Sequence, residues 1–283
     1  MNVGIGLPSW IPGTAGVEVL GWAKRAEETG FSSLGVVDRI GYGTYDPHVT
    51  LAAAAAVTTT VKLVTMVVIA PLRSTASLAK EAATVQALSG GRLVMGLAVG
   101  ARTEDYVISG IPSAGRGERF TSLLEDLPAA WAATSLVPGP VRPGLPPLLL
   151  GGSSDIALGR AAALADGYVH GGGPPRLFER TVTTVTDAWY QAGRSRPPLL
   201  WAQAYFALGN DAEIDRGRAR VRDYYRFTGP FADRIAEGVL ATPHAIAQFV
   251  RGYSEAGCDE LVLLPSSNGI AQVDRLSDIL GRL

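Results

Sequence analysis

KLVTMVVIAPLRSTASLAKEAATVQALSGGRLVMGLAVG, residues 62–100, holds two apolar runs rich in β-branched residues, and the segment between them has helical spacing. The apolar residues of that middle segment share one face of a helix: Leu78, Ala82, Val85 and Leu88. Gly90 and Gly91 follow, where glycine commonly ends a helix. The stretch therefore predicts a strand, a helix packed on a sheet, and a second strand.

Apolar runs of the same kind recur along the whole chain. They cover residues 2–8, 33–38, 62–70, 93–100, 147–151, 168–171, 199–208 and 260–265. Strands that are apolar on both faces and alternate with helices form a parallel sheet covered by helices. Eight such units predict a single (β/α)8 TIM barrel domain over residues 1–283.

Two segments are longer than a minimal barrel needs, and we read them as loop insertions able to form a lid. They are residues 103–115, after the fourth predicted strand, and residues 209–242, after the seventh. A Pro- and Gly-rich connector spans residues 136–147. The alternative fold is an open doubly wound sheet. Its dinucleotide fingerprint is missing, because the sequence GIGLPS breaks off at Pro8.

Composition restricts the partners and the compartment. The chain of 283 residues has a formal net charge of −1, which gives no sign of nucleic acid or a membrane surface as a partner. Its single cysteine excludes an internal disulfide framework. No signal peptide or transmembrane span is visible, so we expect a soluble cytoplasmic protein.

The carboxyl ends of the strands, where barrel enzymes carry their chemistry, offer few ionisable groups. The three histidines are far apart in sequence, so no metal site is expected. The chain has no Gly-x-Ser-x-Gly elbow and no visible pair of carboxylates at strand ends. A site with many glycines and little acid–base equipment is typical of proteins in which a cofactor carries the chemistry.

The stretch PPLLLGGSSDIALGR, residues 146–160, is the best candidate for holding such a cofactor. Two glycines and two serines separate a predicted strand from a predicted helix, and free amides at a helix start attract phosphate. The plainer interpretation is a βα turn with a capping serine.

Four motifs, taken in order, resemble the bacterial luciferase-like superfamily of flavin- and deazaflavin-dependent oxidoreductases, which have (β/α)8 barrels. They are VVDR (36–39), VVIAPLRSTASLAKEAATVQALSGGR (67–92), LVMGLAVGARTEDY (93–106) and LLLGGSS…ADGYVHGGGPP (148–175). The resemblance implies a bulge at Val67–Val68, often with a non-prolyl cis peptide, that backs the flavin ring. It implies these cofactor-binding residues: Val67, Val68, Ala70, Gly100, Ala101, Arg102, Gly151, Gly152, Ser153, Ser154, Gly171 and Gly172.

The sequence also departs from the family. The deazaflavin sugar-phosphate dehydrogenases carry Asp-His after strand two and Gly-Glu after strand four, where this chain has Asp38–Arg39 and Gly100–Ala101. The loss of both groups argues against that activity and leaves the general acid or base open.

The remaining catalytic candidates each have a structural alternative. They are His170, which is alternatively a buried structural histidine, Asp38, which alternatively fixes its loop, and Arg39, which alternatively pairs with a loop carboxylate. Aromatic residues that could form the wall of a substrate pocket are Trp10, Tyr42, Tyr45 and Tyr106.

The leading functional hypothesis is a monooxygenase that uses reduced FMN, supplied by a reductase, and oxygen on a small organic substrate. The first alternative is hydride transfer with the deazaflavin coenzyme F420. A basic strip for its anionic tail could come from Arg102, Arg160, Arg176 and Arg180. The second alternative is a flavin-binding barrel without catalysis. Because family members commonly pair through barrel helices, we expect a homodimer in which the Ala-rich segment 48–60 allows close helix approach.

Overall fold

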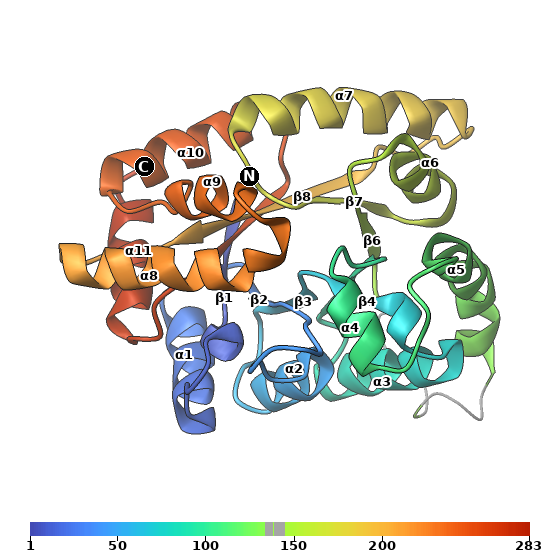
Figure 1. Cartoon of the computed structure of the whole chain (residues 1–283), viewed down its shortest axis with the longest axis horizontal. Helices are drawn as coiled ribbons and strands as arrows, with labels where there is room; N and C mark the ends of the chain where they lie inside the picture. Colours follow the sequence, from blue (N-terminus) through green and yellow to red (C-terminus); the bar gives the residue numbers. More distant parts are fainter. Residues whose placement is uncertain (134–137, 139–144) are drawn as a thin grey trace.

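The computed structural model describes residues 1–133, 138 and 145–283 of the chain (Figure 1). Most of the predicted connector 136–147 therefore lies outside the described residues. Within the described residues, no helix is both long and apolar enough to cross a membrane.

The strands of the described residues form one closed parallel sheet. They are β1 (Asn2–Gly6), β2 (Ser33–Val36), β3 (Lys62–Thr65), β4 (Val68–Ile69), β5 (Leu93–Ala98), β6 (Leu148–Gly151), β7 (Gly167–His170), β8 (Leu199–Phe206) and β9 (Glu260–Pro265). Their order is β3-β2-β1-β9-β8-β7-β6-β5-β4, and pairing of β3 with β5 closes the ring. Because β3 and β4 together occupy one position, the ring is an eight-stranded barrel, and the predicted (β/α)8 fold is confirmed.

The third position of the barrel is broken where the sequence predicted one continuous strand. The peptide bond between Met66 and Val67 is cis, one residue earlier than the expected bulge at Val67–Val68. The break places one extra residue opposite β5, since Val64 pairs with Val94 and Val68 pairs with Leu97. At the break, the Thr65 hydroxyl accepts from the Gly96 amide and donates to the Gly96 carbonyl, both at 2.8 Å. A Cβ on residue 96 would lie 2.1 Å from the Thr65 carbonyl oxygen, so this approach requires glycine.

Helices surround the barrel and cover its outer face (Figure 1). They are α1 (Gly16–Glu28), α2 (Pro47–Ala55), α3 (Thr75–Leu88), α4 (Thr103–Ile108), α5 (Arg116–Ala132), α6 (Asp155–Leu164), α7 (Pro175–Gln191), α8 (Asp211–Tyr224), α9 (Phe231–Glu237), α10 (Pro243–Glu255) and α11 (Ala271–Leu280). The stripe predicted on residues 78–88 is only partly correct. Leu78, Ala82 and Val85 are buried, but Leu88 ends α3 and is 61% exposed.

The alternation of side chains along the strands produces two apolar cores. On β8, Ala202, Ala204 and Phe206 pack in the core between the barrel and its helices. Trp201 and Tyr205 point the other way and belong to a second core inside the barrel. The mouth of the barrel lies directly above this inner core.

The segment after β8 folds back over the inner core. It contains α8, a short 3-10 turn at Arg226–Thr228, and α9, and α8 packs against α9 (Figure 1). Asn210 starts α8 with a capping box, in which its side chain accepts from the Glu213 amide. Val221 and Tyr224 of α8 pack in the inner core. The segment therefore brings aromatic residues to the mouth of the barrel.

Candidate active site

A cavity of about 180 Å³ lies at the carboxyl ends of the strands, which is small beside typical ligand pockets of roughly 300–1,000 Å³. It is lined by Val37, Asp38, Arg39, Met66, Val67, Ile69, Gly100, Ala101, Arg102, Asp105, Gln203, Tyr205, Tyr224, Tyr225 and Phe227. These residues follow β2, lie around β3 and β4, follow β5, or belong to β8, to the end of α8 and to the segment after it. Within the described residues, no group of three or more His, Cys, Asp or Glu is placed to hold a metal ion.

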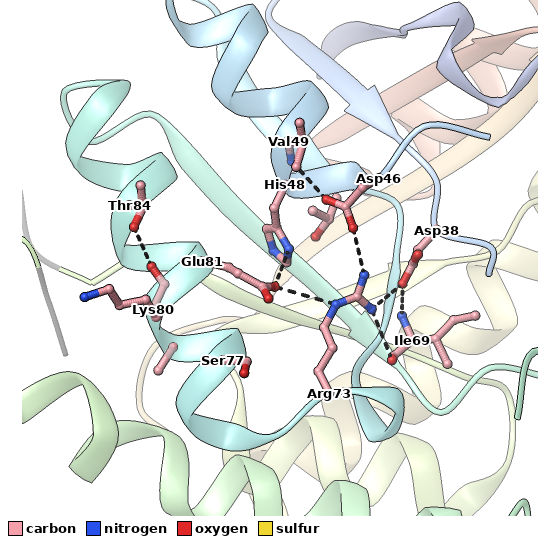
Figure 2. A network of polar contacts seen from close by, with 12 residues as sticks. Asp38, Asp46, His48, Val49, Ile69, Arg73, Ser77, Lys80, Glu81 and Thr84 are labelled. Carbon is pink, nitrogen blue, oxygen red and sulfur yellow. Dashed lines mark hydrogen bonds and ion pairs between the residues drawn. The ribbon is translucent and has the colours of Figure 1, made fainter. Parts of the chain in front are cut away.

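Asp38 is held in place by a buried polar network (Figure 2). Its Oδ2 accepts from the Ile69 amide at 2.9 Å and from Arg73 Nη1 at 2.6 Å. Arg73 also faces Asp46 Oδ2 at 3.4 Å and Glu81 Oε2 at 3.6 Å. Burial lowers the pKa of Arg73, but Asp38, helped by Asp46 and Glu81, outweighs burial and raises it. Asp38 thus joins the end of β2 to β4, as in the structural alternative for this residue.

Arg39 is buried beneath the segment that follows α8. Its Nη1 donates to the Tyr224 carbonyl at 2.7 Å, and its guanidinium lies 4.0 Å from the centre of the Tyr224 ring and 4.7 Å from that of Phe227. Its Nε lies 3.8 Å from Asp105 Oδ2, which gives the expected loop carboxylate as an ion-pair partner. Arg39 therefore fastens the mouth of the barrel to the covering segment.

Two buried polar atoms of the cavity-lining residues have no hydrogen-bond partner in the described part of the chain: Arg102 Nε and Asp105 Oδ2. The other groups of both side chains are engaged. Arg102 Nη1 donates to the Gly41 carbonyl at 3.0 Å and Nη2 pairs with Glu104, while Asp105 Oδ1 accepts from the Gly41 amide at 2.7 Å. Asp105 Oδ2 lies 3.8 Å from Arg39 Nε, within ion-pair distance, whereas Arg102 Nε is a buried donor without a hydrogen-bond partner, which costs stability.

Tyrosines form the wall opposite β3 and β4. Trp10 packs edge-on against Tyr205 and Tyr224, with ring centres 5.3 and 5.2 Å apart. The hydroxyls of Tyr205 and Tyr225 lie 3.1 Å apart. Burial raises the pKa of Tyr205, Tyr224 and Tyr225, so all three stay protonated at neutral pH.

The two glycine turns lie side by side at the neighbouring strands β6 and β7, since Gly151 pairs with Val169. Ser154 caps α6 by accepting from the Ala157 amide at 3.3 Å, and Tyr168 donates to the Gly152 carbonyl at 2.9 Å. At the second turn, Gln203 donates to the Gly171 carbonyl at 3.4 Å. Gln203 also lines the cavity, so it connects the cavity to this turn.

The glycines of these turns differ in whether the backbone conformation and the neighbouring atoms would tolerate a side chain. Gly152 has φ +136° and a Cβ there would meet Ala157 at 2.6 Å, so the chain itself requires it. Gly172, with φ +106°, is restricted in the same way. A Cβ on Gly171 would meet nothing within 4 Å. The open space lies beside Gly171.

His170 is neutral and its ring is held by its neighbours. Its Nδ1 accepts from the Gly172 amide at 3.2 Å, which assigns the proton to Nε2. The ring lies among Tyr168, Phe178 and Tyr253. Burial lowers the pKa of His170 to about 4. This environment fits a structural histidine, and it makes His170 a poor base near neutral pH.

We expect the carbon-bound ring protons of His170 to keep one NMR chemical shift from pH 8 to pH 5 and to titrate near pH 4, with the resonance assigned by His170→Gln. The unfolded chain takes up this proton first, because its pKa is near 6.5. The free energy of unfolding should therefore fall by about 3 kcal/mol as the pH falls from 6.5 to 4. Titration of the His170 resonance near pH 6.5 would contradict this environment.

The structure brings some of the predicted site residues together at the cavity and leaves others outside its lining. Those in the lining are Asp38, Arg39, Val67, Gly100, Ala101 and Arg102. Val68 and Ala70 are fully buried in the core outside the barrel. The turns with Gly151, Gly152, Ser153, Ser154, His170, Gly171 and Gly172 lie at β6 and β7, next to the lining strands.

The predicted aromatic residues are also not in the lining. Trp10 packs behind Tyr205 and Tyr224, and its indole donates to the Pro265 carbonyl at 2.8 Å. Tyr42 packs edge-on against Tyr224 and its hydroxyl donates to Asp223 at 2.7 Å. Tyr45 donates to the Thr14 carbonyl at 2.6 Å, and Tyr106 donates to the Val99 carbonyl. These hydroxyls are engaged within the protein.

Sequence reasoning missed the tyrosine wall. Tyr205 and Gln203 lie inside the run 199–208, which predicts a strand, and alternation along that run indicates their inward direction. Tyr224, Tyr225 and Phe227 belong to the insertion 209–242, which we read as able to form a lid, and the sequence predicts no individual site residue in it. The sequence YYRF at 224–227 was the available signal.

The barrel defines a (β/α)8 protein, and its cavity lies at the carboxyl ends of the strands, where enzymes of this fold carry their active sites. The sequence matches the luciferase-like monooxygenase family over residues 2–260, and the chain belongs to this family. An uncharacterized protein of Mycobacterium tuberculosis is 33% identical over 215 residues, which cover 62% of this chain and 72% of the relative.

Two solved structures share the fold. An F420-dependent secondary alcohol dehydrogenase in complex with an F420–acetone adduct has a TM-score of 0.83 and 16% identity, covering 98% of this chain and 97% of its own. The oxygenating constituent of 3,6-diketocamphane monooxygenase from Pseudomonas putida, a type II Baeyer–Villiger monooxygenase in complex with FMN, has a TM-score of 0.71 and 17% identity, covering 93% and 91%.

Proposed function

We propose that this protein is an oxidoreductase that binds a flavin or a deazaflavin at the mouth of its barrel. The observation that carries this proposal is the cavity itself, which combines the apolar side chains of Met66 and Val67 with two polar atoms that have no hydrogen-bond partner, Arg102 Nε and Asp105 Oδ2. A ring system with adjacent carbonyl and N–H groups on one edge matches that donor and acceptor. Both cofactors have such a ring, and both are found in structures of this fold.

The neighbouring turns fit the phosphate of either cofactor. The N-terminus of α6 follows Gly151–Ser154, Ser153 and Ser154 are exposed, and the space beside Gly171 is open. The Gly171 carbonyl accepts from Gln203 and the Gly173 carbonyl accepts from Tyr253 at 2.9 Å. The partial negative charges of these two carbonyl oxygens are therefore satisfied within the protein and do not oppose a phosphate. We propose that these turns hold the phosphate while the ring occupies the cavity.

The first candidate reaction is oxygenation of a small organic substrate with reduced FMN from a reductase. Its support is the aromatic side of the cavity, formed by Tyr205, Tyr224, Tyr225 and Phe227, because exclusion of water protects a reactive reduced cofactor. A bound flavin supplies the electron-transfer chemistry. The residues of this chain bind the ring at Arg102 and Asp105, exclude water at Tyr224 and Phe227, and hold the mouth together through Arg39.

The second candidate is hydride transfer with coenzyme F420. Two of the four arginines proposed for its anionic tail, Arg176 and Arg180, are exposed on α7, which packs beside α6. The other two are engaged, since Arg102 is buried and Arg160 bonds to Thr121 and the Gly117 carbonyl. An exposed pair of arginines at this place favours a cofactor with a long anionic tail.

A parallel titration with FMN and with coenzyme F420, followed by quenching of cofactor fluorescence, tests the proposal and separates its two forms. Binding of FMN with turnover under air supports the monooxygenase, and binding of F420 with anaerobic turnover supports hydride transfer. If neither cofactor binds, the proposed function is wrong.

A further inference from the structure

Two tyrosines at the cavity share a hydrogen bond that leaves one proton free. Tyr205 is on the inward face of β8, and Tyr225 follows α8 directly. Their hydroxyl oxygens lie 3.1 Å apart, and either can be the donor. Two hydroxyls have two protons and their mutual bond uses one, so the pair keeps one proton for a third oxygen.

The other strong donors at the cavity are largely engaged by the protein. Arg39 donates to the Tyr224 carbonyl and faces Asp105, and Gln203 donates to the Gly171 carbonyl. Arg102 keeps one free donor, Nε, which the proposed function assigns to the cofactor edge. The tyrosine pair is therefore the donor left for a substrate.

The position of the pair follows from the order of the strands. In the closed ring, β3 with β4 and β8 stand four positions apart and face one another across the barrel. A flat ring lying against Met66 and Val67 would turn its free face toward Tyr205. The space between the two walls is where a reacting substrate would lie.

We propose that the Tyr205–Tyr225 pair is an oxyanion-binding site, and that the substrate of the proposed oxidoreduction is a carbonyl compound or alcohol whose oxygen binds there. This inference rests on the proposed function. Addition of a nucleophile to a carbonyl carbon forms one bond at carbon, breaks the C=O π bond and leaves that electron pair on oxygen. A fixed O–H donor stabilises the charge as it develops.

The surroundings keep the pair in its donating form. Burial raises the pKa of both tyrosines, more than the nearby Arg39 guanidinium lowers it. Both hydroxyls are therefore protonated at neutral pH. The positive charge of Arg39, stacked beside Tyr224, adds attraction for an anionic oxygen.

The test uses the full chain without added cofactor and 4-nitrophenolate as an oxyanion probe, titrated by its visible absorbance. We expect the protein to bind the phenolate in preference to nitrobenzene, which lacks the oxygen. Tyr205→Phe and Tyr225→Phe should each weaken phenolate binding by roughly 10- to 100-fold and leave nitrobenzene binding unchanged. The control Tyr190→Phe, at a tyrosine 59% exposed on α7, should have no effect on either probe.

Equal phenolate affinity in wild type and both cavity variants would overturn the proposal, as would equal wild-type affinity for the two probes. Cofactor titrations on the same variants distinguish this failure from failure of the proposed function. The phenylalanine variants keep the aromatic wall, so FMN or F420 affinity should stay at the wild-type value. A loss of cofactor affinity in these variants would place the tyrosines at the cofactor and contradict a substrate site.

Discussion

Arg73→Met should lower the free energy of unfolding by about 3–5 kcal/mol, the usual cost of leaving one charge of a buried pair without its partner. The side chains of Arg73 and Asp38 are only 10% and 2% exposed, and their bond measures 2.6 Å. Without the guanidinium, the Asp38 carboxylate keeps the Ile69 amide but loses its counter-ion. Urea denaturation followed by tryptophan fluorescence measures the change, provided the slope is unchanged.

A second variant shows that the uncompensated charge is the cause. Asp38→Asn combined with Arg73→Met removes both charges and should be more stable than Arg73→Met alone. The control Arg222→Met breaks an exposed pair with Asp233, whose side chains are 50% and 58% exposed, and should change stability by less than about 1 kcal/mol. An Arg73→Met variant as stable as the Arg222→Met control would contradict the role assigned to the network.

Gly171→Asp should weaken cofactor binding by roughly 100-fold while the fold remains intact. A carboxylate ~5 Å from a phosphate, at an effective dielectric constant of ~20, repels it by about 3 kcal/mol. The substitution is tolerated by the chain, because Gly171 has no left-handed φ and a Cβ there meets nothing within 4 Å. The measurement is the cofactor titration, with thermal unfolding as the check on folding.

Gly171→Asn is the matched control, since it has nearly the same size and no charge. Its affinity should stay within a few-fold of wild type, and added salt should reduce the deficit of the aspartate variant. Equal losses in both variants would mean that the space beside Gly171 matters and the phosphate charge does not. Unchanged affinity in Gly171→Asp would remove the phosphate from this turn.

The barrel could be predicted because each unit repeats one local pattern, whereas the break in its third strand could not. The run 62–70 is apolar throughout and reads as one strand. At the break one extra residue stands opposite β5, and the Thr65 hydroxyl bonds to Gly96, thirty-one positions away; periodicity contains no information about either feature. As a result Val68 and Ala70 face the outer core, although they were expected at the cofactor.

The site residues that follow strand ends could be predicted from the sequence. The site residues of the segment after β8 could not, because that segment reaches the cavity only by folding back over the barrel. Asp38, Arg39, Gly100, Ala101 and Arg102 come directly after strands and line the cavity as a barrel requires. Tyr224, Tyr225 and Phe227 reach the same cavity only because the end of α8 and the turn after it pack on the inner core. The sequence YYRF at 224–227 indicates an aromatic cluster, but only the tertiary packing brings that cluster to the cavity.

A crystal structure with the cofactor selected by the titration tests the central claim most directly. We predict that the ring lies against Met66 and Val67, that its polar edge bonds Arg102 Nε and Asp105 Oδ2, and that the phosphate contacts the turn at Gly151–Ser154. Tyr205 and Tyr225 should face the free side of the ring. A ring bound outside this cavity, or one that leaves Arg102 Nε and Asp105 Oδ2 without partners, would contradict the account.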